Sequence, residues 1–132
     1  MQNYTEEIRK ISPFVNLLGL TVEKIDNGFC RSSVEIKKDF LNKRKIVHGG
    51  VIYSMADISM GLAVYSMLQP DEETTTAEIK INYLRPAAVK SLSCEARVLS
   101  KGKTLAVLEA EVKDADKLIA KALGTFSILK LT

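Results

Sequence analysis

The feature that most constrains this chain is the segment from Val51 to Leu68, which is apolar on every face of a helix. A helix without a polar face packs in the interior of a protein. The segment carries one carboxylate, Asp57, and opens directly after His48-Gly49-Gly50. We therefore expect a central, buried helix that holds a single acidic side chain in the core.

A buried carboxylate behind a di-glycine helix start favours particular chemistry. Burying even a neutral polar group without a partner costs roughly 2–7 kcal/mol, so a buried Asp57 indicates a functional or a partnered group. The glycines leave the amides of the helix start open, and those amides suit a developing oxyanion. This combination favours acyl transfer or hydrolysis. The structural alternative is an Asp57 that only bonds a neighbouring loop or subunit.

Composition narrows the class of protein. The 132 residues predict a single domain spanning 1–132, and 46% hydrophobic with 27% charged residues is a soluble, globular balance. A net charge of +3 without tryptophan does not favour nucleic-acid binding. Serines and Asp57 lower the hydropathy of 51–68, so we expect a core helix rather than a membrane span. Residues 1–11 lack a signal-peptide pattern, and we expect a cytoplasmic protein.

The two cysteines and the one histidine make a metal site improbable. Cys30 and Cys94 fall on the apolar phase of strand-like segments, where reduced cysteines act as small core residues. We therefore expect no metal.

Periodicity predicts an α+β fold. A short amphipathic helix is expected from Asn3 to Ile11, ended by Pro13. Strands are predicted over residues 17–25, 29–36, 75–84, 91–99, 104–113 and 117–129. We expect the last four strands to form an antiparallel meander, and the sheet to curve around the long helix. The rest of the helix surface then needs a partner subunit or a loop.

Three motifs together resemble a known family: Asn42 to Gly50, Asp57, and Ile81-Asn-Tyr-Leu-Arg-Pro-Ala87. They resemble the hotdog-fold thioesterases, most closely the phenylacetate-degradation subgroup of acyl-CoA thioesterases in the 4-hydroxybenzoyl-CoA thioesterase superfamily. The resemblance implies a curved antiparallel sheet wrapped around one long central helix. It also implies homodimers that pair into homotetramers, with active sites between subunits. Because coenzyme A is part of the substrate, no cofactor is expected.

The resemblance implies roles for four residues. Asp57 matches the carboxylate that acts as general base or nucleophile on the thioester. Gly49 matches the residue whose N–H polarises the thioester carbonyl, and Asn42 matches a side chain near that carbonyl. Thr76 stands where relatives place a hydroxyl, often serine, that positions the attacking water.

Helix geometry predicts that this site is shared between chains. Asp57 follows Gly49 by eight residues, which is roughly 12 Å along a helix axis. An Asp side chain recovers only a few of those ångströms. Both groups can act on one thioester only if they come from different chains related by a two-fold axis. We therefore expect a composite site at a dimer interface.

Further residues, beginning with His48 and Gly50 at the helix start, are candidates for binding the substrate and its coenzyme A. We expect His48 to cap or pack at the helix start, beside Gly50, rather than to act as a catalytic imidazole. Ser54 shares a face with Asp57, although such serines more often bond back to their own helix. Arg85, Lys101 and Lys103 come first among the basic residues that could hold the phosphates of coenzyme A. The alternative is that these exposed side chains serve only solvation.

The sequence thus predicts a hydrolase that converts an aryl- or medium-chain acyl-CoA to free acid and coenzyme A. The alternative is a non-catalytic acyl-CoA-binding hotdog module, because one fold serves several functions. A hydratase is less favoured, since it needs an imidazole–carboxylate pair and His48 has no evident partner. No membrane partner is expected.

Overall fold

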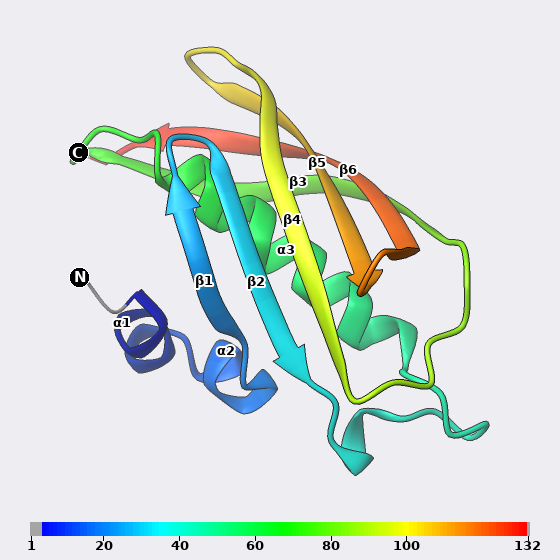
Figure 1. Cartoon of the computed structure of the whole chain (residues 1–132). Coiled ribbons are helices and arrows are strands. Elements are labelled where there is room, and N and C mark those ends of the chain that lie inside the picture. The colour runs from blue at the N-terminus through cyan, green and yellow to red at the C-terminus, as the bar shows by residue number, and fades with distance from the viewer. Residues whose placement is uncertain (1–3, 132) are drawn as a thin grey trace.

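In the computed structural model, which describes residues 4–131, a six-stranded antiparallel sheet curves around the helix α3 (Figure 1). The elements are α1 (Tyr4–Ile11), α2 (Pro13–Leu18), β1 (Thr21–Asp26), β2 (Phe29–Glu35), the 3-10 turn η1 (Lys38–Phe40), α3 (Gly49–Tyr65), β3 (Glu72–Tyr83), β4 (Ser91–Lys101), β5 (Leu105–Asp114) and β6 (Lys117–Lys130). The predicted α+β class is confirmed. Of the predicted first helix, Asn3 lies outside the described residues.

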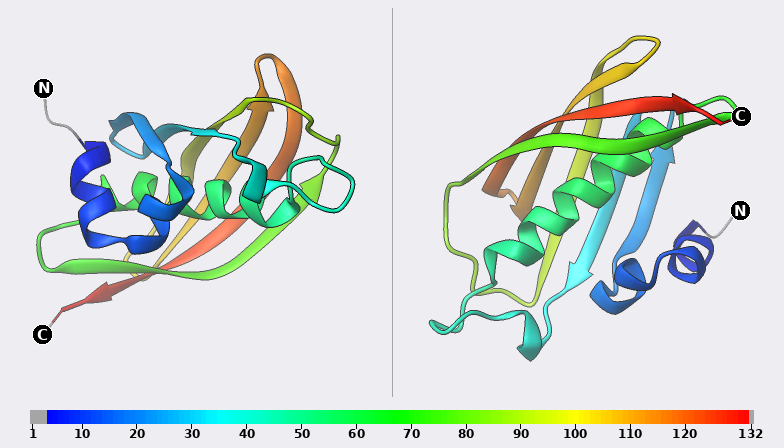
Figure 2. Two further views of the ribbon diagram at one scale, coloured as in Figure 1. Left: turned by 90° about the horizontal axis from the view of Figure 1, so that it is seen from below. Right: turned by 180° about the vertical axis from the view of Figure 1, so that it is seen from behind.

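The order of the strands differs from the predicted meander. The sheet runs β1-β2-β4-β5-β6-β3, so β3 pairs with β6 at one edge and is not the neighbour of β4. The connection 84–90 passes the start of α3, where the amide of Val47 donates to the carbonyl of Ala87 at 2.8 Å (Figure 2). The expectation of four consecutive neighbours was therefore wrong for β3, because this crossing carries the chain from one edge of the sheet to its middle.

The region after α1 also differs from the prediction. α1 ends at Ile11, just before Pro13, as predicted, but Pro13 also opens a second helix, α2, with Ser12 as its N-cap and Gly19, at φ 72°, as its C-cap. Proline suits the first helical turn, because the amide that it lacks has no partner there. Leu17 therefore lies in α2, and the predicted strand from residue 17 begins only at Thr21.

The core lies between α3 and the inner face of the sheet. The strand predicted over 104–113 is confirmed as β5, in which every second residue from Ala106 to Val112 is buried: Ala106, Leu108, Ala110 and Val112. Cys30 and Cys94 are buried and free, as expected, and burial raises the pKa of each thiol to about 12.

A pair of serine hydroxyls lies within this core. The hydroxyls of Ser32 on β2 and Ser59 on α3 lie 2.8 Å apart, and both side chains are fully buried. A buried polar group without a partner is costly, so this pair favours one position of α3 along the sheet.

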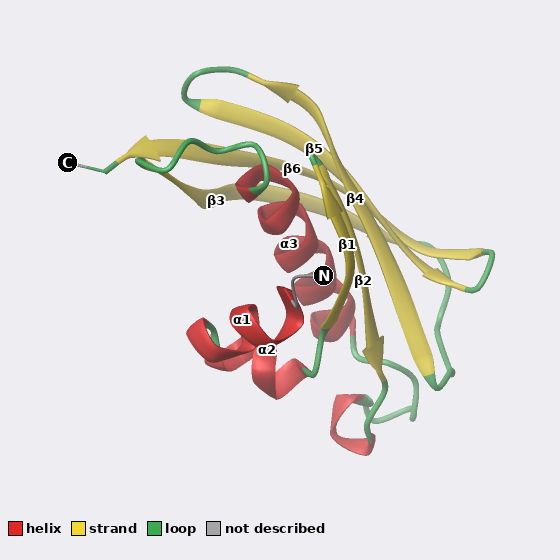
Figure 3. Cartoon of the chain, turned by 60° about the vertical axis from the view of Figure 1, so that its left-hand side comes forward, coloured by secondary structure: helices red, strands yellow, loops and turns green. Residues whose placement is uncertain are grey.

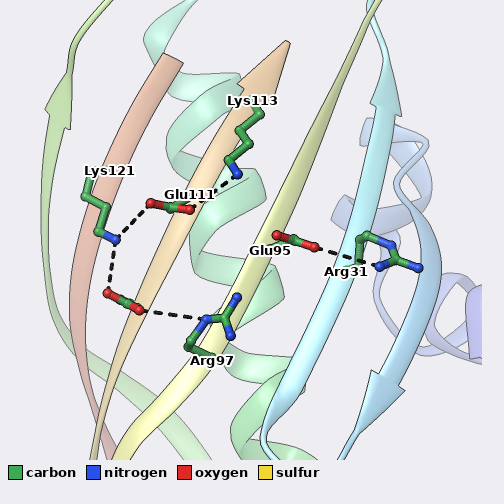
Figure 4. Close-up of polar contacts among 7 residues, drawn as sticks. Arg31, Glu95, Arg97, Glu111, Lys113 and Lys121 are labelled. Atoms are coloured by element: carbon green, nitrogen blue, oxygen red, sulfur yellow. Dashed lines mark hydrogen bonds and ion pairs between the residues drawn. The ribbon is translucent and has the colours of Figure 1, made fainter. Parts of the chain in front are cut away.

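The outer face of the sheet carries a network of ion pairs (Figure 4). Glu109 lies 3.7 Å from Arg97 and 3.0 Å from Lys121. Glu111 lies 3.0 Å from Lys121 and 3.6 Å from Lys113. The bond from Lys121 is the main cause that lowers the pKa of the Glu111 carboxyl. These charges neutralise one another across β4, β5 and β6.

One side of α3 remains uncovered, although α1 and α2 lie on the same side of the sheet as α3 (Figure 3). Tyr53 is 36% exposed, Tyr65 is 60% exposed, and Asp57 is only partly buried. The sheet therefore covers only part of the helix surface, in line with the expectation that the rest needs a partner subunit or a loop, and what covers that rest stays a prediction. Among residues 4–131, no helix is long and apolar enough to cross a membrane.

Candidate active site

The start of α3 leaves one backbone amide open. The helix was predicted to open after Gly50. It begins at Gly49 instead, so Gly49 and Gly50 form its first turn. His48 is the N-cap, and its Nδ1 accepts a 2.8 Å hydrogen bond from the amide of Gly50, while its carbonyl accepts from Val51 at 3.0 Å. The predicted capping role of His48 is confirmed. No acceptor among residues 4–131 bonds the amide of Gly49, which is left as the free donor.

A pocket of about 350 Å³ adjoins this helix start. It brings together three predicted site residues, Asn42, Gly49 and Arg85, and adds Arg44. The side-chain oxygen of Asn42 accepts from the amides of Arg44 at 2.8 Å and Ile46 at 3.4 Å, which holds the loop before the helix in shape. The pocket therefore combines an open amide with two guanidinium side chains.

Tyr83 is a pocket residue that the sequence analysis did not single out as functional. Its hydroxyl donates to the carbonyl of Gly49 at 3.1 Å, and a Cβ at Gly49 would lie 3.3 Å from its ring. Partial burial raises the pKa of Tyr83, and the nearby Tyr53 raises it further by a smaller amount. The signal that could have found Tyr83 was its place in the motif Ile81 to Ala87, just before Arg85 and Pro86.

Asp57 and Thr76 form a second group on the uncovered side of α3. The Thr76 hydroxyl donates to Asp57 Oδ1 at 2.7 Å, and thus joins α3 to the edge strand β3. The expectation that Asp57 is buried is wrong for one chain, since its side of the helix is open. Ser54 does not bond Asp57 but donates to the carbonyl of Gly50 at 2.8 Å, as serines in helices often do.

The open amide of Gly49 and the carboxylate of Asp57 do not meet within one chain. Asp57 and Gly49 both lie in α3, eight residues apart, or roughly 12 Å along its axis. Lys101 and Lys103 lie at the β4–β5 hairpin, at the opposite end of β4 from the loop that holds Arg85 (Figure 1). Among residues 4–131, no group of three or more His, Cys, Asp or Glu side chains is placed to hold a metal ion.

Sequence comparison places the chain among known proteins. A family model described as "Thioesterase superfamily" matches residues 45–121. A protein of Saccharolobus solfataricus named "Putative esterase SSO2140" is 37% identical over 127 residues, which are 95% of this chain and 90% of that relative. The medium/long-chain acyl-CoA thioesterase YigI of Salmonella typhimurium is 26% identical, with 88% of this chain and 85% of the relative covered.

Solved structures agree with the fold. The conserved protein PA5202 of Pseudomonas aeruginosa superimposes with a TM-score of 0.86 at 38% identity, covering 89% of this chain and 94% of that chain. The PaaI protein from the phenylacetic acid degradation operon of E. coli superimposes with a TM-score of 0.86 at 23% identity, covering 96% and 93%. Both likenesses extend over most of the chain.

Proposed function

Because this chain belongs to the thioesterase superfamily and has the predicted hotdog fold, we propose that it hydrolyses an acyl-CoA at a site that two subunits share. The observation that carries this proposal is the combination of an open amide at Gly49 with a carboxylate, Asp57, that is held by a hydroxyl. The first group suits a developing oxyanion and the second suits a proton acceptor.

In the proposed reaction, Asp57 accepts a proton from water as the water oxygen attacks the thioester carbon. The oxyanion that forms accepts a hydrogen bond from the amide of Gly49 of the partner subunit. When this intermediate collapses, the carbon–sulfur bond breaks, and the coenzyme A sulfur takes the proton from Asp57. Thr76 holds one carboxylate oxygen, which leaves the other for the water. Asn42 completes the surroundings of the carbonyl.

Direct attack by Asp57 is the alternative route, through an acyl-aspartyl anhydride that water then opens. A single turnover in water labelled with heavy oxygen distinguishes general-base action from an anhydride that water opens at the aspartyl carbon. General-base action places the label in the acid product and none in Asp57. Label in the Asp57 carboxylate, detected by peptide mass spectrometry, would establish attack by the carboxylate instead.

The proposal of a shared site rests on the axial separation of Asp57 from Gly49 and on the exposed surface beside them. Within the described part of the chain, β3 pairs with β6 along one side and with no strand along the other. An unpaired edge strand offers backbone groups to another chain. Tyr53 and Tyr83 are 36% and 50% exposed beside this edge, and aromatic side chains are enriched at interfaces. A two-fold dimer, paired further into a tetramer, would bring Asp57 of one chain to Gly49 of the other.

We place coenzyme A at the pocket beside Gly49. Arg44 and Arg85 line this pocket, and guanidinium groups bind phosphate well. Lys101 and Lys103 can join the same coenzyme A only from another subunit, because they lie at the far end of β4. Removing these charges should raise the KM for an acyl-CoA more than the KM for the matching acyl-pantetheine. An unchanged ratio would remove them from the site.

The test of the proposed function is release of free thiol from a panel of acetyl-, hexanoyl-, decanoyl-, palmitoyl- and benzoyl-CoA. Cys30 and Cys94 are buried, so the protein should add little background to a thiol reagent. We expect turnover by the wild type and a fall in kcat of about 10²–10⁴ for Asp57→Asn. No turnover of any thioester, with tight acyl-CoA binding intact, would instead support the binding-module alternative.

A further inference from the structure

We infer that the acyl chain of the substrate lies in a groove between α1 and β3, and that Gly61 on the floor of this groove sets the length of chain that is accepted. The inference rests on the proposed function and names the part of the molecule that holds the acyl group. It is independent of how coenzyme A is bound.

The groove has a volume of about 410 Å³ and runs along the uncovered side of α3. Residues from α1 and α2 line one wall, Glu73 and Thr74 of β3 line the other, and α3 forms the floor. Its apolar lining includes Ile8, Ile11, Val15, Ile58, Leu62 and Phe126. The two acidic members of its lining, Glu7 and Glu73, are both exposed. The lining therefore suits an apolar chain without a charged end.

Gly61 is the unusual residue of this groove. A glycine inside a helix is destabilising relative to alanine, so its presence calls for a reason. Packing within the chain does not supply one, because a Cβ at Gly61 would meet only Phe126, at an ordinary contact distance of 3.5 Å. The missing side chain therefore leaves open space in the groove. We assign that space to the acyl chain.

The groove begins beside the proposed catalytic pair. Gly61 follows Asp57 by one helical turn on the same side of α3, roughly 6 Å along the axis. Thr74 precedes Thr76 by two residues, so both point to the same face of β3. A thioester carbon held at Asp57 would thus send its acyl chain past Gly61 toward Tyr65, the last residue of α3.

A second apolar groove meets α3 at its other end, near His48 and Gly50, and is lined by Phe14 and Leu17 of α2. It adjoins the helix start rather than the Asp57–Thr76 pair, and it includes the capping imidazole. The groove at Gly61 is therefore the better place for an apolar tail, and the second groove supplies the control.

The test is the dependence of kcat/KM on chain length for the series Gly61→Ala, Gly61→Val and Gly61→Leu, with saturated acyl-CoAs from acetyl to palmitoyl. We expect the optimum to move toward shorter chains as the side chain grows. For Gly61→Leu, we expect kcat/KM on decanoyl-CoA to fall roughly tenfold or more, because the side chain fills space that the substrate needs. The kcat/KM for acetyl-CoA should fall much less than that for decanoyl-CoA, since the acetyl group does not reach Gly61.

Two controls keep the outcome specific. Gly61→Ala removes the glycine with the least added volume, so it should raise the melting temperature and shift the length profile least. Leu17→Trp adds bulk to the second groove and should leave the profile unchanged. A uniform loss across all chain lengths in Gly61→Leu, or a shifted profile in Leu17→Trp, would overturn the inference while the proposed function stands. A wild type without activity on any acyl-CoA would overturn the proposed function itself.

Discussion

The outer face of the sheet and the uncovered side of α3 both carry carboxylates, but they give them different partners. On the outer face, Glu109 and Glu111 each lie within 4 Å of two basic side chains (Figure 4). On α3, Asp57 accepts a hydrogen bond from the neutral hydroxyl of Thr76 at 2.7 Å. No ion pair joins Asp57 to a basic side chain among residues 4–131.

This difference separates structural from reactive carboxylates. A carboxylate next to a cation holds its charge firmly and is a weak proton acceptor. A carboxylate that bonds only a hydroxyl keeps both its charge and an available oxygen. The molecule therefore places its paired charges where they tie strands together and leaves Asp57 where a substrate can reach it.

The largest effect is expected when Asp57 is given a cationic partner like those of Glu109 and Glu111. Thr76→Lys removes the hydroxyl and brings an ammonium group within reach of Asp57, from an exposed position of the edge strand. We expect kcat to fall by about 10²–10⁴, because the ion pair weakens the base. The melting temperature, measured alongside thiol release, should change little. A Thr76→Lys variant with wild-type kcat would contradict the role of Asp57 as the base.

A smaller effect is expected when the hydroxyl is removed without adding charge. A hydrogen bond to a charged group is worth about 1.5–3 kcal/mol, so Thr76→Val should lower kcat by roughly 10- to 150-fold. Thr76→Ser keeps the hydroxyl and is the matched control, with kcat near that of the wild type. Equal rates for the valine and serine variants would show that the Thr76 hydroxyl has no part in the reaction.

Much of this arrangement could be predicted from the sequence, because local patterns determine it. The alternation in β5 located its buried residues, and the spacing of His48, Gly49 and Asp57 located the two ends of the site. The apolar faces of α3 predicted cover by the sheet and by a partner subunit or a loop, but could not say which of the last two provides it. Asp57 was therefore expected to be buried, whereas one chain leaves it partly open.

The rest depends on contacts between distant parts of the chain. Nothing in the period-two pattern of β3 indicates that it pairs with β6 rather than β4. The bond from Tyr83 to Gly49 joins residues 34 positions apart and depends on that pairing. The groove at Gly61 likewise requires α1 and β3 on either side of α3, which periodicity does not place. The functional role of these residues becomes visible only in three dimensions.

On the side of α3 that faces the sheet, substitutions should change the free energy of unfolding rather than the activity. Ser59→Ala leaves the Ser32 hydroxyl buried without its partner, so we expect a loss of about 1–3 kcal/mol in the free energy of unfolding. Replacing both serines by alanine should recover part of that loss, because no unpaired hydroxyl remains. Chemical denaturation measures both variants. A double variant that loses the sum of the single losses would argue against the pairing.

The smallest effect is expected on the outer face. Glu111→Gln should lower the free energy of unfolding by at most about 1 kcal/mol, because exposed ion pairs contribute little, and should leave kcat unchanged. The lowered pKa of Glu111 means that its contribution is present above its unfolded pKa and lost as pH falls through its folded pKa.

Lys121 determines how the contribution of the same ion pair is lost at high pH. Although partial burial opposes it, the bonds to Glu109 and Glu111 raise the pKa of Lys121, so its contribution is lost as pH rises through that value. The difference in free energy of unfolding between wild type and Glu111→Gln should therefore be largest near neutral pH and become smaller at both lower and higher pH. A difference that grows in acid would contradict this assignment.

The most direct test of the account is complementation between inactive subunits. Asp57→Ala and Gly49→Val should each be inactive alone, and chains that have been unfolded and refolded together should form mixed dimers. Each mixed dimer would contain one site with both wild-type residues, so a random mixture should show about a quarter of wild-type activity. Activity no greater than that of the separate variants, with mixed dimers demonstrated by mass spectrometry, would contradict a site shared between subunits.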